Sequence, residues 1–137
     1  MSRTTFVDTQ FVIALVNRRD QDHQRAVELS HAFTNQSLLT TELVLVEIGD
    51  ALAGEFRREA MQLIEFFRRA ANVEIAALTP ALFDDAFALY CSRHDKDWGL
   101  TDCVSFVVMS REQVRDALTF DQHFEQAGFS ALLRRQS

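Results

Sequence analysis

Four acidic residues stand where carboxylates can do chemistry together. Asp8 ends a short β-branched and aromatic run and precedes a helical pattern, and Asp121 does the same after a later run of that kind. Asp102 stands at the start of a helical pattern, and Glu47 lies inside the apolar run LVLVEI at residues 43–48. A carboxylate in such apolar surroundings needs a partner or a cation, because burying an unpaired charge is costly.

Each of these acids also has a purely structural interpretation. The three aspartates would cap helices or favour the positive end of a helix dipole. Glu47 would pair with an arginine such as Arg57 or Arg58. Separate caps have no reason to converge, however, and four like charges in a small space repel one another. Divalent cations would remove that repulsion, and hard oxygen ligands select Mg²⁺ or Mn²⁺ over Zn²⁺.

The elements that must position these acids follow from the hydrophobic pattern. Short apolar runs predict strands over residues 4–8, 37–40, 73–76, 116–120 and 129–132. Amphipathic or apolar periodicity predicts helices over residues 9–19, 21–34, 42–53, 55–71, 80–93, 101–112 and 121–126. This alternation is typical of βαβ units and of a parallel sheet that is covered on both faces.

Such a sheet would bring two of the acids to one edge. Functional residues of parallel α/β sheets lie outside the carboxyl ends of the strands. Asp8 and Asp121 both end strands, and Glu47 and Asp102 lie on helices that can reach the same edge. Thr41, Thr79 (followed by Pro80) and Thr101 are predicted to cap the helices that follow them.

Composition limits the class of protein. The 137 residues, 47% of them hydrophobic and 25% charged, predict one folded domain over residues 1–137 and exclude a disordered chain. No apolar stretch approaches the roughly 20 residues of a membrane helix, and residues 1–7 are too short and polar for a signal peptide, so we expect a cytoplasmic protein with no membrane partner. Cys91 and Cys103 are expected to be buried, reduced thiols.

The net charge of −6 argues against a passive nucleic-acid binder. It does not exclude an enzyme that acts on nucleic acid through metal ions, because clustered carboxylates bind the metals and raise the acidic count. The residues that could guide an RNA chain to such a site are Arg18, Arg19, Arg57, Arg58, Arg68, Arg69, Arg93 and Lys96. Each of them also has a plain interpretation as a solvated side chain.

Four segments together resemble the acidic motifs of PIN-domain ribonucleases. They are FVDT at residues 6–9, VLVEI at 44–48, LTDC at 100–103 and LTFDQHF at 118–124. Their order and context match the family, and the resemblance covers nearly the whole chain. In size the chain is similar to the stand-alone VapC-type toxins of bacterial toxin–antitoxin pairs.

The resemblance implies a fold and an activity. The fold would be a three-layer α/β/α sandwich around a parallel sheet of about five strands. The activity would be Mg²⁺- or Mn²⁺-dependent endonucleolytic cleavage of RNA. Asp8, Glu47, Asp102 and Asp121 would be the catalytic and metal-binding residues. The ions would activate a water and neutralise charge in the transition state, and a carboxylate would accept the proton of that water.

Other residues match the motifs less directly. Thr9 matches the hydroxyl residue that commonly follows the first acid, and Thr119 matches the one two positions before the last acid. Ser105, near the third motif, is a further candidate to support the acids. Gln10 departs from the family, which often has a small Ser or Asn there. We interpret His123 as a surface residue of the last short helix.

Two further interpretations concern an acid before the third motif and two aromatic residues. Asp97 is expected to be a solvated loop acid. Trp98 and Phe56 could stack on unpaired bases, but packing in the core or an interface is favoured for both.

The leading functional hypothesis is therefore the toxin of a toxin–antitoxin pair. The partners implied by the resemblance are an RNA substrate, a small antitoxin that covers the site, and a second copy of the chain in a homodimer. The alternatives are a PIN nuclease of RNA processing and a catalytically silent PIN-like binding module. A phosphoacceptor signalling module is disfavoured, because it needs a lysine near the last strands and the only lysine, Lys96, falls in a predicted loop.

Overall fold

Five parallel strands form the central sheet in the order β3-β2-β1-β4-β5. The structure is a computed structural model that describes residues 3–32 and 35–134. The strands are β1 (Thr4–Val7), β2 (Ser37–Thr41), β3 (Val73–Ala76), β4 (Asp116–Leu118) and β5 (Ser130–Ala131). The predicted parallel sheet of about five strands is confirmed.

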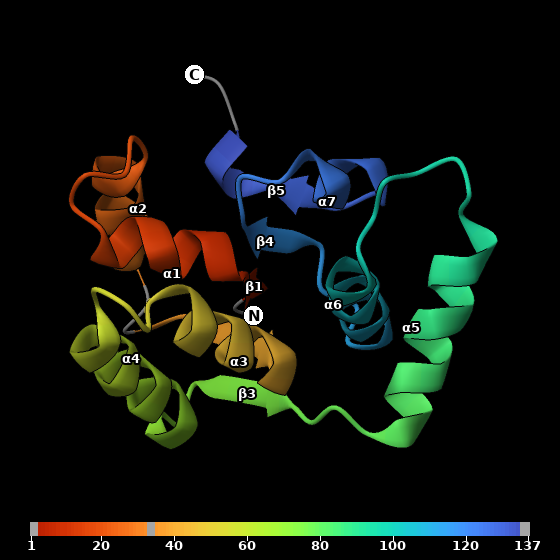
Figure 1. Cartoon of the computed structure of the whole chain (residues 1–137), viewed down its shortest axis with the longest axis horizontal. Helices are drawn as coiled ribbons and strands as arrows, with labels where there is room; N and C mark the ends of the chain where they lie inside the picture. The colour runs from red at the N-terminus through yellow and green to blue at the C-terminus, as the bar shows by residue number, and fades with distance from the viewer. Residues whose placement is uncertain (1–2, 33–34, 135–137) are drawn as a thin grey trace.

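Helices cover both faces of this sheet (Figure 1). One layer contains α1 (Thr9–Val16), α2 (His23–Ser30), α3 (Glu42–Ala51) and α4 (Arg57–Arg69), and the other contains α5 (Pro80–Ser92), α6 (Leu100–Arg111) and α7 (Gln122–Gln126). This division follows from right-handed crossovers, because the chain moves across the sheet from β1 to β3 and then returns to β4 on the other side of β1. The predicted three-layer α/β/α sandwich is confirmed.

The reversal of direction beside β1 determines where a ligand can bind. Val7 at the end of β1 is paired with Leu118 at the end of β4, so the residues that follow both strands leave the sheet side by side. The backbone N–H of Asp8 extends this pairing by donating to the carbonyl of Leu118 at 3.3 Å. In open α/β sheets, a crevice forms at such a switch point.

Aromatic packing supports the carboxyl end of the sheet from beneath. Phe124 is fully buried, and its ring lies 5.0 Å from that of Phe106 in an edge-to-face arrangement and 6.2 Å from that of Phe6. Trp98, 5.0 Å from Phe106, is also buried, which confirms the packing role expected for it. These contacts join α7 and the segment before α6 to β1 in one hydrophobic core.

Two of the three predicted threonine caps are confirmed. The Thr41 hydroxyl accepts the N–H of Val44 at 3.0 Å, and the Thr79 hydroxyl accepts that of Leu82 at 3.1 Å. Thr101 is not a cap, because α6 begins at Leu100 and Gly99 is its N-cap. The prediction failed there because Asp102, three residues after Gly99, reaches back to its backbone N–H at 3.0 Å and starts the helix earlier.

Several predicted helices are too long. The helix predicted over 9–19 ends at Val16, because Asn17 is extended and its side chain accepts the N–H of Arg19 at 3.0 Å in a turn. Helix α2 is shorter than the predicted 21–34, of which positions 33 and 34 lie outside the described residues. After β5, the chain forms a short 3₁₀ helix, η2 (Leu132–Arg134), instead of continuing the predicted strand.

The two cysteines differ in exposure. Cys103 is buried inside α6 as predicted, whereas Cys91 is exposed on α5 and the prediction for it was wrong. Which positions of α5 are exposed depends on the elements that pack against it, and the sequence alone does not identify those elements. Within residues 3–32 and 35–134, no helix combines the length and the apolar character that crossing a membrane requires.

Candidate active site

A pocket of about 550 Å³ opens at the carboxyl ends of β1 and β4. Among the described residues that line it, five are acidic and none is basic. The lining residues are Asp8, Thr9, Gln10, Glu47, Asp50, Ala51, Thr101, Asp102 and Asp121. The four acids singled out by the motifs thus lie around one pocket, although they come from four separate segments of the chain.

Asp8 is the most buried of these acids, with only 9% of its surface exposed. It stands at the N-cap position of α1, but its side chain makes no capping hydrogen bond, so the cap interpretation does not explain it. Burial raises the pKa of Asp8 to about 7, and the charges of Asp102 and Glu47 push in the same direction. Hydrogen bonds from the Thr119 hydroxyl and the Thr9 backbone oppose the rise in pKa without cancelling it.

Thr119 connects Asp8 to Asp121. Its fully buried hydroxyl donates to Asp8 Oδ2 at 2.8 Å and accepts the backbone N–H of Asp121 at 3.1 Å. A hydroxyl can donate once and still accept, so one side chain satisfies both contacts. The position of the first acid is thereby tied to the backbone that carries the last one.

Thr9 makes the corresponding contact with Glu47. Its hydroxyl donates to Glu47 Oε1 at 2.7 Å, which joins the first turn of α1 to the middle of α3. Glu47 is half-buried and lines the pocket, and Thr9 is a polar partner of the kind that a carboxylate in this apolar run was expected to need. Among the described residues, no ion pair joins Glu47 to Arg57 or Arg58, the alternative partners considered for it.

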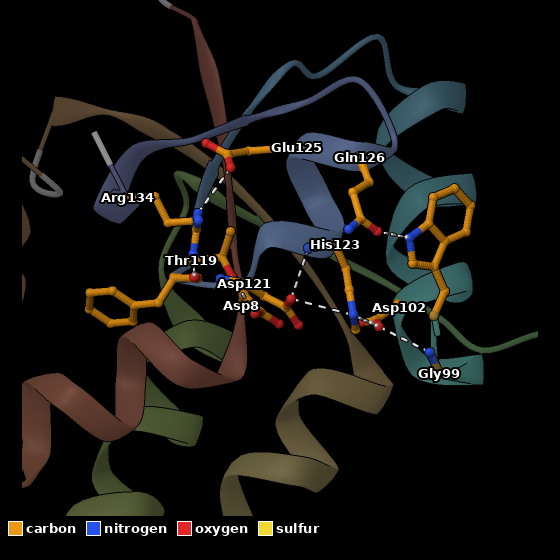
Figure 2. A network of polar contacts seen from close by, with 11 residues as sticks. Asp8, Gly99, Asp102, Thr119, Asp121, His123, Glu125, Gln126 and Arg134 are labelled. Atoms are coloured by element: carbon orange, nitrogen blue, oxygen red, sulfur yellow. Dashed lines mark hydrogen bonds and ion pairs between the residues drawn. The ribbon is translucent and has the colours of Figure 1, made fainter. Parts of the chain in front are cut away.

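Asp102, Asp121 and His123 form a second group beside Asp8 (Figure 2). The Nδ1 atom of His123 lies 2.9 Å from Asp102 Oδ2 and 3.3 Å from Asp121 Oδ1. One potential ligand atom from each of the three residues lies within 4.8 Å of the others. His123 is therefore not the surface residue that the sequence predicted, because its ring is only 22% exposed and is turned toward the acids.

The remaining candidates lie farther from the pocket or were missed. Ser105 is 1% exposed in the interior of α6 and does not line the pocket. Asp97 is exposed, as expected of a loop acid. Sequence reasoning missed Asp50, whose only signal is its position three residues after Glu47 on the same helix face. It also missed the role of His123, which depends on the packing of α7 against α6.

The chemistry of these side chains suits a divalent cation. Carboxylate oxygens are the ligands that Mg²⁺ and Mn²⁺ prefer, and the pocket offers them from several directions without a competing lysine or arginine among its described lining residues. The raised pKa of Asp8 comes mainly from its burial, and the charges of Asp102 and Glu47 add to it; a bound cation would favour the ionised carboxylate.

A family model described as "PIN domain" matches residues 5–130. The chain belongs to the PIN-domain family. The match spans all four acidic segments and the whole sheet except for one residue at each end.

Two kinds of comparison relate this PIN domain to characterised proteins. It is 29% identical over 124 residues to the "23S rRNA-specific endonuclease VapC20" of Mycobacterium tuberculosis, an alignment that covers 90% of this chain and 94% of the relative. The crystal structure of M. tuberculosis VapC20, described as a sarcin-ricin loop cleaving toxin, superposes with a TM-score of 0.82 at 26% identity and covers 93% of this chain and 98% of that one.

A more distant structure shares the fold. It is VapBC2 from Rickettsia felis, bound to a DNA fragment from its promoter, with a TM-score of 0.64 at 13% identity. The superposition covers 93% of this chain and 96% of that chain. At this identity the likeness concerns the arrangement of helices and strands alone.

The pKa of Asp8 predicts a pH dependence of stability in metal-free protein. The folded chain binds the Asp8 proton more tightly than the unfolded chain does, because the pKa rises from 3.8 to about 7 on folding. The contribution of Asp8 to the free energy of unfolding is therefore greatest below about pH 4 and is lost as the pH rises toward 7.

The measurement is urea unfolding in EDTA at several pH values, with Asp8→Asn as the comparison. We expect the stability of Asp8→Asn relative to the native chain to increase between about pH 4 and pH 7, because the amide does not ionise. A stability difference that stays constant over this range would show that Asp8 titrates normally.

Proposed function

We propose that residues 1–137 act as a single metal-dependent endoribonuclease domain and as the toxin of a toxin–antitoxin pair. The observation that carries this proposal is the pocket shared by Asp8, Glu47, Asp102 and Asp121. The family membership and the likeness to a VapC toxin over nearly the whole chain support the same activity.

The proposed roles follow from the positions of the side chains. Asp8, Asp102 and Asp121 are linked through Thr119 and His123, and they would hold a divalent ion. Such an ion supplies positive charge to the scissile phosphate and lowers the pKa of a bound water. Glu47 lies on α3, in the helical layer opposite the one that contains Asp102. Its Oε1 is oriented by the hydroxyl of Thr9. We assign it the acceptance of the proton from the attacking water.

The proposed substrate is RNA with an accessible loop. The relative VapC20 is named for 23S rRNA and its structure for the sarcin-ricin loop, so ribosomal RNA is the first substrate to test. We also propose an antitoxin as partner, supported by the VapBC2 complex of the same fold, and the cytoplasm as the site of action. A silent binding module is disfavoured because all four acids are present and share a pocket.

The activity test compares two aspartates. Purified protein should cut 23S rRNA or looped RNA in Mg²⁺ or Mn²⁺ and stop in EDTA. Asp8→Asn should lower the cleavage rate at least about 100-fold, because it removes one negative ligand at nearly constant volume. The control Asp97→Asn removes the same charge from an exposed loop and should cut at the native rate. Native cleavage rates in Asp8→Asn would contradict the metal-site role.

Expression in cells separates a toxin from a housekeeping nuclease. Induction of the native chain should arrest growth, whereas induction of Asp8→Asn should not. Cleavage in vitro without growth arrest would favour the alternative, a PIN nuclease of RNA processing.

We further propose that two copies pair through the exposed face of α5. Phe83, Phe87 and Tyr90 are 42%, 48% and 47% exposed, and their rings follow one another at 6.1 and 6.4 Å. Three large aromatic side chains in one exposed row are unusual for a monomer and typical of an interaction surface.

Light scattering on a sizing column tests this pairing. The native chain should have the mass of a dimer, and Phe87→Glu should have that of a monomer, because the new charge would have to be buried in the interface. Phe66→Glu is the matched control, since Phe66 is similarly exposed, at 47%, but lies on α4. A monomeric native chain would contradict the proposal.

A further inference from the structure

His123 differs from the acids around it because it does not line the pocket but contacts two residues that do, Asp102 and Asp121. It occupies the first turn of α7, and its backbone N–H donates to Asp121 Oδ1 at 2.9 Å. From this anchor its ring turns to Asp102 on α6, and Figure 2 shows the ring lying between the two carboxylates.

The chemistry of these neighbours identifies the atom that carries the proton. Ionised carboxylates accept hydrogen bonds and cannot donate them. Nδ1 of His123, 2.9 Å from Asp102 Oδ2 and 3.3 Å from Asp121 Oδ1, must therefore carry the hydrogen. An N–H at Nδ1 exists both in one neutral tautomer and in the imidazolium ion, so the contact does not depend on the charge of the ring.

These contacts occupy one oxygen of each aspartate. Asp102 Oδ2 accepts the N–H of Gly99 at 3.0 Å as well as the His123 ring. Asp121 Oδ1 accepts the His123 backbone and lies near the same ring nitrogen. Within the part of the chain that the structure describes, no hydrogen bond engages the second oxygen of either carboxylate, which leaves it for an ion in the pocket that both residues line.

The short helix that carries His123 is held in place by its neighbours. The Phe124 side chain is fully buried beneath it, and the side-chain oxygen Oε1 of Gln126 accepts the indole N–H of Trp98 at 3.0 Å. A five-residue helix fixed at both sides can hold the ring in one orientation. This rigidity suits a group whose purpose is to orient others.

We propose that His123 is a positioning residue, which uses its Nδ1–H to hold Asp102 and Asp121 in the orientation that receives the divalent ion. The inference rests on the proposed metal-dependent function and adds a fifth residue, His123, to the four acids of the proposed site. The shared N–H also places a positive dipole between two carboxylates that would otherwise repel each other. The pair is thereby preset for the ion before it arrives.

Three substitutions at this position test the proposal by Mn²⁺ binding, measured by calorimetry. The side-chain N–H of His123→Asn can occupy the place of Nδ1–H, whereas that of His123→Gln lies one bond farther out and His123→Leu has none. We expect His123→Asn to keep the Mn²⁺ affinity within about threefold of the native chain. His123→Gln and His123→Leu should weaken the affinity about 10- to 100-fold. His94→Leu, an exposed loop histidine, is the control and should bind as the native chain does.

Two further measurements separate positioning from other roles. The melting temperatures of His123→Asn and His123→Gln in EDTA should be similar. A loss of Mn²⁺ affinity in His123→Gln alone then does not reflect a loss of folding. Electron spin echo spectroscopy of bound Mn²⁺ should show no coupling to a histidine nitrogen in the native chain, because the ring acts from behind the carboxylates.

The outcomes are distinguishable. Coupling of Mn²⁺ to a histidine nitrogen would make His123 a ligand and overturn the proposal. Equal Mn²⁺ affinities of His123→Asn, His123→Gln and His123→Leu would also overturn it. In both cases the nuclease function would stand if the native chain binds Mn²⁺ and cuts RNA. A native chain that binds no Mn²⁺ would overturn the inference together with the proposed metal-dependent activity.

Discussion

The burial of one carboxylate, Asp8, beside other acids at one sheet edge is the constraint on which the rest of this structure depends. The strand order places the ends of β1 and β4 side by side, and α3 and α6 bring further acids to the same cavity. Burial and neighbouring charge raise the pKa of Asp8 to about 7. The fold therefore keeps a carboxylate out of water and close to other acids, and a divalent cation is the group that would favour its ionised form.

Short polar side chains keep this arrangement in register. Thr119 ties Asp8 to the backbone of Asp121, Thr9 orients Glu47, and the backbone N–H of Gly99 donates to Asp102 Oδ2 at 3.0 Å. The fully buried side chain of Phe124 anchors α7 in the hydrophobic core. Asp8, Glu47 and Asp102 are thus each held by a hydrogen bond, which reduces the rearrangement needed when an ion binds.

The sequence predicts this fold well where the signal is local. The alternation of apolar strands with helices predicts the parallel sheet, and Thr41 and Thr79 mark true helix starts. Local signals fail where a distant or competing contact decides, as at Gly99, where the Asp102 side chain begins α6 before Thr101. His123 was misplaced for the same reason, since its partner Asp102 is 21 residues away on another helix. The roles of the acids remain predictions.

The most direct test of the account is a crystal structure of the native chain grown with Mn²⁺ and measured at a wavelength where manganese scatters anomalously. The account predicts an anomalous peak inside the pocket, about 2.2 Å from oxygens of Asp8, Asp102 and Asp121, because Mn²⁺ binds carboxylates at close to that distance. A pocket without such a peak at saturating Mn²⁺, while the carboxylates keep the positions described above, would contradict it.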